Sequence, residues 1–358
     1  RIRELQNGGV TFSNHHAVFP TVTRVNSASI ATGCLPERHG LVENFLYLPE
    51  LIPGETIDTG SHVKLRVIDR LTGGNLLEVP TLTQSVTNAG MTVAVVTSSS
   101  SGACFLQNPE GVGLTVNPAF QCPEGTEVQG RFGPPPSKEC PGERLNEWIT
   151  VIMAEHVIPE LKPNLGVIWF CDPDNTQHEF GLGAAESQMA ACIVDRCVGR
   201  LIDAVHKSGA DDYTNIIIMS DHGWISHSAP LQVAEALSAA GLGDDVVIAG
   251  QGVYQNNGTD LPDIVDCLIS VEGMGALFTR EGLPGSLPYD LIGYDHHRSP
   301  DVLFTSAWNG EENSFGVPGT ARGYGVGGHG GASSYEIRSM MAASGPDFHR
   351  GLVSEIPS

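Results

Sequence analysis

The sequence is poor in basic residues and has no long apolar run. It contains 19 Lys and Arg against 41 Asp and Glu, which gives a formal net charge of -22 at pH 7. A nucleic-acid-binding surface gathers Lys and Arg on one face, so this balance argues against such a surface. No apolar stretch reaches the roughly 20 residues that a membrane-spanning helix requires, so we expect no membrane span. An acidic protein that binds phosphate needs a local source of positive charge, and bound metal supplies one.

The sequence also has no Cys-x-x-Cys pair of the kind that zinc ribbons use, although it contains eight cysteines. Most of them fall in apolar or helical contexts, where a buried free thiol is expected. Cys104, Cys122 and Cys140 lie in a stretch rich in Gly and Pro, where a disulfide is the alternative.

Apolar patterns along the chain predict alternating helices and strands. Helices are expected over residues 145–158 and 184–206, and buried strands over residues 165–170 and 214–219. Strands that alternate with helices indicate a mostly parallel sheet that is covered on both faces. Residues 97–143 are rich in Gly, Pro and Ser with weak periodicity, which predicts an irregular insertion beside the core. We expect residues 1–358 to form one α/β domain, with two smaller domains as the alternative.

The first chemical feature follows a predicted buried strand. The segment VIWFCDPDNTQH carries the strand directly into Asp174 and His178. Ligand sites in open α/β sheets form at the carboxyl ends of strands. A carboxylate and an imidazole four residues apart on a helical turn can converge on one cation. The alternative is that Asp174 only caps the next helix.

Asp221 and His222 repeat this arrangement at the end of the next predicted strand. Adjacent side chains point apart in a regular strand, but a turn at Gly223 can bring both to one metal. Two strand ends that carry Asp and His favour a metal site over capping. His329 stands in a loop dense in glycine, GVGGHGG, which lets the backbone approach a ligand closely.

The segment 19–33 predicts a helix with Thr23 at its N-cap and Asn26 one turn further on the same face. The positive end of a helix dipole attracts phosphate and favours an alkoxide over a hydroxyl. Taken alone, the pattern also fits an ordinary Thr cap followed by a surface Asn.

The order and spacing of these clusters resemble the type I phosphodiesterase and nucleotide pyrophosphatase family of the alkaline phosphatase superfamily. Residues 23–44, TRVNSASIATGCLPERHGLVEN, resemble the nucleophile segment of the family, and the three clusters downstream follow in the order of the family. Residues 343–348, ASGPDF, resemble a further stretch near its C-terminus. The resemblance implies a single catalytic domain with an alkaline phosphatase-like fold, a three-layer α/β/α sandwich with a mostly parallel central sheet.

The resemblance also implies two zinc ions, with manganese as an alternative, and a phosphothreonine intermediate on Thr23. It assigns one metal to Asp174, His178 and His329, and the other to Asp221, His222 and Thr23. Asn26 would donate a hydrogen bond to the developing phosphoryl charge. In the family, the second metal takes a further Asp from the first core strand, and no residue of this chain can be assigned to that Asp. We therefore expect that this strand is missing from the chain. We expect the same of the last C-terminal elements of the family.

A small-molecule phosphoester is the implied substrate, most closely a phosphodiester or nucleotide pyrophosphate. Asn44, Phe45 and Tyr47 are predicted to line the leaving-group pocket, and the alternative is that the two aromatic rings belong to the core. A phosphonoacetate-type C–P hydrolase or a phosphomonoesterase of the same superfamily is the second hypothesis. A non-catalytic metal-binding remnant is the third. The resemblance implies a location outside the cytoplasm.

One local motif points elsewhere. Cys34, Pro36 and Arg38 match the Cys-x-Pro-x-Arg pattern at which sulfatases form their nucleophile. In sulfatases a Thr-Gly pair follows the cysteine, whereas here Thr32 and Gly33 precede it. The phosphodiesterase pattern therefore fits the segment better.

Overall fold

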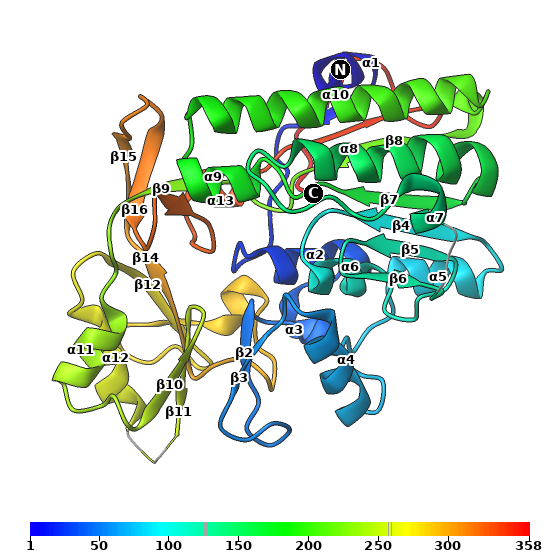
Figure 1. The fold of residues 1–358 in the computed structure, drawn as a ribbon. Helices are drawn as coiled ribbons and strands as arrows, with labels where there is room; N and C mark the ends of the chain where they lie inside the picture. Colours follow the sequence, from blue (N-terminus) through cyan, green and yellow to red (C-terminus); the bar gives the residue numbers. More distant parts are fainter. Residues whose placement is uncertain (125–127, 257, 259) are drawn as a thin grey trace. The chain divides into compact units, whose positions relative to one another are not determined.

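The computed structural model describes residues 1–124, 128–256, 258 and 260–358, and the chain divides into two compact units. The first unit comprises Arg1–His16, Thr81–Ser220 and Arg338–Ser358, and the second comprises Ala17–Pro80 and Asp221–Ile337. Each unit is described separately, and both can be followed in Figure 1.

The first unit is an α/β structure. Its helices are α1 (Ile2–Gly8), α5 (Leu82–Asn88), α6 (Ser101–Gln107), α7 (Val128–Phe132), α8 (Glu143–Ile152), the π-helix η1 (Met153–Leu161), α9 (Asp174–Phe180), α10 (Ala185–Lys207) and the 3-10 helix η2 (Asp211–Tyr213). Its strands are β1 (Val10–Phe12), β4 (Val93–Thr97), β5 (Leu114–Asn117), β6 (Phe120–Cys122), β7 (Leu165–Trp169), β8 (Ile216–Met219), β18 (Met341–Ser344) and β19 (Leu352–Ser354).

Two four-stranded sheets lie in this unit, in the orders β6-β5-β4-β7 and β19-β1-β18-β8. Strand β4 pairs in parallel with both β5 and β7, as the alternation of strands and helices predicts, and β6 joins β5 in the antiparallel direction. In the other sheet, β1 pairs in parallel with β19, whereas β18 pairs antiparallel with β1 and β8.

Helices cover both faces of the sheet that contains β4. Ala94 and Val96 on β4 pack in one apolar cluster with Trp148 and Ile149 of α8. The alternate β4 residues point to the opposite face, and helices α5 and α6 contact the same strand. Helix α10 packs along α8 and η1, and Figure 1 shows it running beside α8. A sheet between two helical layers results.

The prediction of an irregular insertion at residues 97–143 is wrong for part of that stretch. The described part contains helix α6, strands β5 and β6 and helix α7, and β5 is a central member of the sheet. Strand β5 is only four residues long, and its residues are all buried. Such a short strand between Gly-rich turns leaves no periodic signal in the sequence.

The second unit contains helices, one mixed five-stranded sheet, one mixed four-stranded sheet and a two-stranded hairpin. Its helices are α2 (Thr23–Thr32), α3 (Pro36–His39), α4 (His62–Leu71), α11 (Val233–Ala239), α12 (Leu261–Ile269), the 3-10 helix η3 (Tyr289–Ile292) and α13 (Ser334–Ile337). Its strands are β2 (Phe45–Tyr47), β3 (Thr56–Asp58), β9 (Ile225–Ala229), β10 (Val246–Ala249), β11 (Gly252–Gln255), β12 (Met274–Thr279), β13 (Leu287–Pro288), β14 (Val302–Ser306), β15 (Trp308–Glu312), β16 (Pro318–Arg322) and β17 (Gly327–Gly328).

The core of the second unit lies between helices and the five-stranded sheet, whose order is β10-β11-β14-β12-β13. Leu237 of α11 and Ile264 of α12 pack with Val253, Leu277 and Val302 of the sheet. The other two sheets have the orders β15-β16-β9-β17 and β2-β3. Eight of the ten predicted site residues lie in this unit, on helix α2, on strand β2 and in loops between its elements.

All eight cysteines are free thiols, so the alternative of a disulfide at Cys104, Cys122 or Cys140 is not what the structure contains. Burial raises the pKa of Cys104 to about 12, as expected for a thiol enclosed in the core. Among the described residues, no helix combines the length and the apolar character that crossing a membrane requires.

Candidate active site

Helix α9 places Asp174 and His178 side by side in the first unit. The helix begins at Asp174, shortly after strand β7, and His178 follows one turn later. The imidazole Nε2 of His178 lies 3.4 Å from Oδ1 of Asp174. Residues four apart on a helix share one face, so the predicted convergence of the two side chains is observed.

Asp172, rather than Asp174, anchors the start of α9. Its Oδ1 accepts hydrogen bonds from the backbone N–H and the hydroxyl of Thr176, at 3.3 and 2.7 Å. Its Oδ2 accepts from the backbone N–H of Gly142 and the amide of Asn146, at 2.7 and 3.1 Å. The capping role that the sequence left open for Asp174 therefore falls to Asp172, which sequence reasoning passed over.

In the second unit, Thr23, Asp221 and His222 converge. The Nε2 atom of His222 lies 3.2 Å from the Thr23 hydroxyl and 3.3 Å from Oδ2 of Asp221. The His222 side chain is almost fully buried. Three predicted residues from segments about 200 positions apart in the sequence therefore meet at one point.

The hydrogen bonds of His222 fix which ring nitrogen carries its proton. Its Nδ1–H donates to the carbonyl of Gly223 at 2.9 Å, so in the neutral ring Nε2 presents a lone pair. That lone pair faces the carboxylate of Asp221, which is also an electron donor. A cation between the two atoms would stabilise this arrangement, and zinc is one metal that binds nitrogen and oxygen ligands of this kind. These residues fit a metal ion.

His329 lies against His222 in the same unit. The two rings stack with centroids 3.6 Å apart and planes 16° apart. The Nδ1–H of His329 donates to the carbonyl of Thr21 at 2.8 Å, which leaves Nε2 as the ligand atom. Carbonyl oxygens on Nδ1 orient both imidazoles in the way that metal-binding histidines require.

Glu336, a buried residue that the sequence did not single out, forms hydrogen bonds to the loop after His329. The carboxylate of Glu336 accepts from the backbone N–H of Gly331 at 2.7 Å and from the hydroxyl of Ser333 at 2.6 Å. Burial raises the pKa of Glu336, and these hydrogen bonds oppose the rise. Helix α13, on which Glu336 lies, therefore positions the loop that carries His329.

The prediction that Thr23 is the N-cap of its helix is wrong by one residue. Helix α2 begins at Thr23, and the N-cap is Val22, whose side chain makes no capping hydrogen bond. A capping Thr uses its hydroxyl to accept a backbone N–H. At the first helical position the hydroxyl is instead turned to His222. The shift suits a nucleophile better than the predicted cap.

The structure does not support the predicted role of Asn26. Its Oδ1 accepts from the backbone N–H of Val18 at 2.8 Å, and its Nδ2 donates to the carbonyls of Val18, Pro20 and Val22. The side chain is buried, and its amide is bound to the segment that leads into α2. Asn26 therefore fixes the approach of the chain to Thr23 and has no amide hydrogen directed to a ligand.

Asn44, which the sequence places in the leaving-group pocket, contacts the start of helix α2. Its Oδ1 accepts from the backbone N–H of Arg24, the residue after Thr23, at 3.1 Å. This bond orients the amide so that Nδ2 points away from the helix backbone. The side chain is partly exposed. A donor next to the helix N-terminus is the group that a phosphoryl charge at Thr23 requires.

The two predicted aromatic residues differ in their surroundings. Phe45 is 41% exposed, whereas Tyr47 is 8% exposed and packs edge-to-face on Tyr254 with ring centroids 5.5 Å apart. Tyr47 and Tyr254 form a small buried cluster with Ala249. The prediction that Tyr47 contacts substrate is therefore wrong, because its ring is part of the core, and Phe45 stays a candidate.

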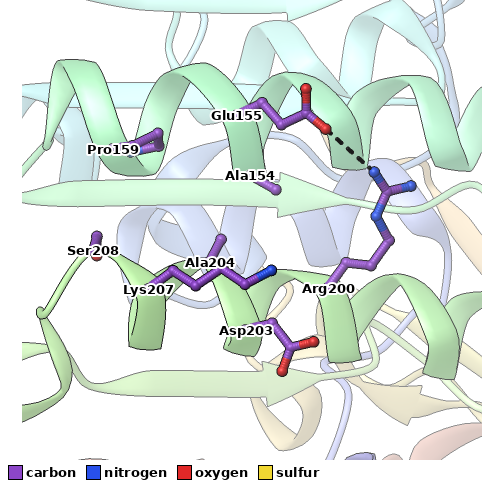
Figure 2. A pocket seen from close by; sticks show the side chains of 8 residues that line it. All are labelled: Ala154, Glu155, Pro159, Arg200, Asp203, Ala204, Lys207 and Ser208. Atoms are coloured by element: carbon purple, nitrogen blue, oxygen red, sulfur yellow. Dashed lines mark ion pairs between the residues drawn. The ribbon is translucent and has the colours of Figure 1, made fainter.

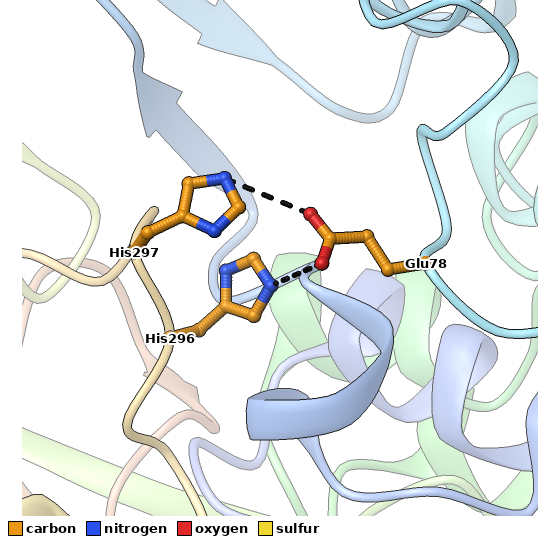
Figure 3. Close-up of side chains that lie close together, drawn as sticks. All are labelled: Glu78, His296 and His297. Atoms are coloured by element: carbon orange, nitrogen blue, oxygen red, sulfur yellow. Dashed lines mark ion pairs between the residues drawn. The ribbon is translucent and has the colours of Figure 1, made fainter.

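A second group with ligand-type side chains lies in the second unit, where the Glu78 carboxylate faces the neighbouring rings of His296 and His297 (Figure 3). The Nε2 atoms of the two imidazoles are 3.2 and 3.6 Å from its oxygens. Nδ1 of His296 accepts the backbone N–H of Arg298, so the proton of the neutral ring is on Nε2, facing Glu78. The Arg298 guanidinium also lies 3.2 Å from Glu78. The Glu78 carboxylate therefore already has a positive partner, the Arg298 guanidinium.

A groove of about 340 Å³ lies on the first unit between η1 and α10 (Figure 2). Its charged lining residues are Glu155, Arg200, Asp203 and Lys207, and Glu155 and Arg200 form an ion pair at 3.5 Å. Positive and negative groups alternate along it, and it contains none of the predicted site residues. The carboxylates of Glu155 and Asp203 offset the positive charge that a phosphate site requires.

Comparison with known proteins agrees with the sequence resemblance. The family model of type I phosphodiesterase / nucleotide pyrophosphatase matches residues 1–309. Venom phosphodiesterase of Macrovipera lebetinus is 26% identical over 223 residues, which is 62% of this chain and 22% of the relative. Mouse ectonucleotide pyrophosphatase/phosphodiesterase family member 1 is 28% identical over 222 residues, 62% of this chain and 21% of the relative. The matched segment thus spans about a fifth of these relatives.

Solved structures show the fold. Murine ectonucleotide pyrophosphatase/phosphodiesterase 5 superposes with a TM-score of 0.70 at 16% identity, covering 99% of this chain and 85% of that one. Phosphonoacetate hydrolase from Sinorhizobium meliloti gives 0.67 at 19% identity, covering 98% and 84%. The expected alkaline phosphatase-like α/β fold is confirmed. With the family model matching most of its length, the chain belongs to the type I phosphodiesterase / nucleotide pyrophosphatase family.

Proposed function

We propose that the chain hydrolyses phosphodiesters or nucleotide pyrophosphates through a covalent phosphothreonine on Thr23. The observation that carries the proposal is the Thr23 hydroxyl, which lies at the start of helix α2 and 3.2 Å from Nε2 of His222. The solved structures that resemble this chain include an inactive mouse protein with a threonine changed to alanine, in complex with AMP. A nucleotide substrate and a threonine nucleophile are consistent with that relative.

Two metal ions, zinc or in its place manganese, would supply the positive charge that lowers the pKa of a hydroxyl and offsets the charge on a phosphoryl group. The residues proposed for one ion are Asp174, His178 and His329. Those proposed for the other are Asp221, His222 and Thr23. The assignment rests on the family resemblance, and the ring tautomers of His222 and His329 support it.

In the proposed reaction, Oγ1 of Thr23 loses its proton and attacks phosphorus. The bond between phosphorus and the leaving oxygen breaks, and the leaving group takes up a proton. Water then attacks phosphorus, the bond to Oγ1 breaks, and Thr23 regains its hydroxyl. Asn44 donates a hydrogen bond to the phosphoryl oxygens, and the N-terminus of α2 adds its dipole.

Phe45, exposed and next to Asn44, is the proposed contact for the leaving group.

We propose further that the two compact units form one catalytic domain. Following relatives that are named ectonucleotide and venom enzymes, we place the protein outside the cytoplasm. The proposed partner is a small-molecule phosphoester.

The test is turnover of three substrates by the purified protein with zinc or manganese: bis-p-nitrophenyl phosphate, p-nitrophenyl phosphate and phosphonoacetate. Preference for the diester supports the proposal. Preference for phosphonoacetate supports the second candidate, a C–P hydrolase, which the similarity to phosphonoacetate hydrolase favours. Hydrolysis of none of the three rejects both and leaves a non-catalytic metal-binding protein.

The variant Thr23→Ala tests the nucleophile. It should lose turnover and retain its bound metal, because His222 and Asp221 are unchanged. Thr32→Ala is the matched control, since Thr32 lies at the other end of the same helix and its hydroxyl donates to the carbonyl of Ala28. Full activity of Thr23→Ala would reject the covalent mechanism.

A further inference from the structure

Glu43 is a fully enclosed carboxyl group directly before Asn44. It is 1% exposed. Its Oε1 accepts from the backbone N–H of Asn44 at 2.7 Å, and its Oε2 accepts from the backbone N–H of Gln251 at 3.2 Å. One carboxylate thus joins the segment before β2 to the turn between β10 and β11.

The approach of the carboxylate to that turn depends on Gly250. This glycine has a φ of +59°, and a Cβ atom on it would lie 2.6 Å from the carboxyl carbon of Glu43. A side chain at this position would therefore be strained and would displace the carboxylate. The lack of a side chain at Gly250 therefore leaves room for the Glu43 carboxylate.

Asn44 is held at three further points. Its carbonyl accepts from the backbone N–H of Thr59 at 3.0 Å and from the Thr59 hydroxyl at 2.7 Å. Its side-chain oxygen accepts from Arg24. Glu43 adds the bond to the N–H group, so the backbone of Asn44 is fixed on both sides. A backbone held in this way determines where the Asn44 amide is placed beside Thr23.

We propose that Glu43 is a positioning residue for phosphoryl transfer, which acts by holding the backbone of Asn44 so that its amide meets the phosphoryl oxygens. The inference rests on the proposed function, because it assigns Glu43 a role in that same site. A small misplacement of a group that contacts the transition state is costly, since a shift of about 1 Å lowers a rate by about 100-fold. The simpler alternative is that Glu43 only stabilises the fold.

The ionisation of Glu43 gives an independent readout. Burial raises its pKa to about 7, while the hydrogen bonds from Asn44 and Gln251 and the charge of Arg24 oppose the rise. The other titratable groups that interact with it are Tyr254 and Tyr294, whose pKa values it helps to raise. Below pH 7 the protonated acid can no longer accept from both N–H groups, so kcat should decrease.

The experiment is a double-mutant cycle on bis-p-nitrophenyl phosphate with Glu43→Gln, Asn44→Ala and the double variant. Glutamine keeps the volume but presents an NH₂ group to one of the two backbone donors. We expect Glu43→Gln to lower kcat by about 10- to 100-fold, with KM within about twofold and metal content unchanged. In the Asn44→Ala background the same change should lower kcat by less than about twofold. The acid limb of the kcat profile near pH 7 should weaken in Glu43→Gln.

Asp301→Asn is the matched control, because Oδ2 of Asp301 accepts from the backbone N–H of Gln255 at 2.7 Å in the same unit. It should leave kcat unchanged. Should Glu43→Gln be recovered only in unfolded form, Glu43→Asp, which keeps the charge on a shorter side chain, takes its place in the cycle. An equal loss of kcat in both Asn44 backgrounds, or no loss in either, overturns the proposal. Absence of turnover in the wild-type protein rejects the proposed function and the role of Glu43 with it.

Discussion

Nε2 of His222 lies 3.2 Å from the hydroxyl oxygen of Thr23, although the two residues are 199 positions apart in the sequence. The Nδ1–H of His222 donates to the carbonyl of Gly223. In the neutral ring Nε2 therefore has no proton to donate. The pair therefore joins the proposed nucleophile to a nitrogen lone pair that can bind a cation. The predictions below follow from this arrangement and from the groups that hold it in place.

Replacing His222 by alanine should remove one of two bound metal ions. Loss of one imidazole leaves the second ion with oxygen ligands only, and zinc content should decrease from about two to about one per chain. Metal analysis after dialysis measures this, together with loss of turnover. His206→Ala is the control, because His206 is an exposed residue paired with Asp211 in the first unit. Two zinc ions in His222→Ala would contradict the assignment.

Asn44→Ala should mainly lower activity, whereas Asn26→Ala should mainly lower stability. Removing Asn44 takes away a donor to the phosphoryl oxygens, so kcat should decrease by about 100-fold, with a small loss of stability from the lost bond to Arg24. Removing Asn26 leaves the backbone groups of Val18 and Pro20 without their partner, which should lower the free energy of unfolding by about 1–3 kcal/mol. Urea unfolding and steady-state kinetics on both variants separate the two effects. A reversed pattern would restore the role predicted from sequence for Asn26.

The contrast between the two asparagines shows what the sequence could and could not predict. Helix α2 consists mostly of small residues, so its buried face has no apolar stripe that a sequence can reveal. Spacing correctly places Asn26 one turn after Thr23, but the helix buries that face. Asn44 lies 21 residues after Thr23, and only tertiary structure brings the two segments together.

Other strands and helices were predictable because, unlike α2, they have strong apolar patterns. Strand β7 has an apolar run that marks it as a strand, although it is an edge strand whose residues are only partly buried or exposed, so the expected burial is not observed. Helix α10 has the periodic apolar residues that follow from burial of one helix face. The Asp and His residues that follow such strands were therefore found. Strand β5, with four residues, and the carboxylates of Glu43 and Glu336, whose partners are backbone N–H groups, leave no comparable signal in the sequence.

Phe45→Ala and Tyr47→Ala should also separate function from stability. Phe45 is exposed, so its removal should raise KM for nucleotide substrates and leave the free energy of unfolding nearly unchanged. Tyr47 packs against Tyr254 in a buried cluster, and its truncation should cost about 3–5 kcal/mol. Kinetics and urea unfolding provide the two measurements. An unchanged KM for Phe45→Ala would remove Phe45 from the substrate site.

The stability of the protein should depend on pH through His39. Burial lowers the pKa of His39 to about 3, and the ring is neutral in the fold because Nδ1 accepts from Leu41 N–H and Nε2–H donates to Ser29. The unfolded chain binds a proton near its ordinary pKa of 6.5. Stability is therefore retained above pH 6.5 and lost as pH decreases towards 3, with a slope of about 1.4 kcal/mol per pH unit.

The pH dependence of stability that comes from Glu43 is opposite in sign to that from His39. A variant of one residue is therefore needed to measure the contribution of the other. The pKa of Glu43 is raised from 4.5 to about 7, so the stability it contributes is complete below 4.5 and decreases as pH rises to 7. Between pH 4.5 and 6.5 the two slopes offset each other in the wild-type protein. In His39→Gln only the Glu43 slope remains, so relative to the wild type the free energy of unfolding should be larger at pH 5 than at pH 7, as urea unfolding at the two pH values will measure. Parallel pH profiles for the two proteins would refute the assignment.

Gly331→Ala should weaken metal binding through the loop that carries His329. A Cβ atom at this position would lie 2.6 Å from a carboxylate oxygen of Glu336. That carboxylate cannot move freely, because it accepts from the Gly331 N–H and from Ser333 in a buried site. The loop must therefore shift, and His329 with it, which should lower zinc affinity by about 10- to 100-fold. Gly325→Ala, before strand β17, is the comparison: it has no atom near its Cβ position but a φ of +78°, so it introduces backbone strain without a clash with Glu336. Equal zinc affinities in competition with a chelator for Gly331→Ala and the wild type would show that Glu336 does not position His329.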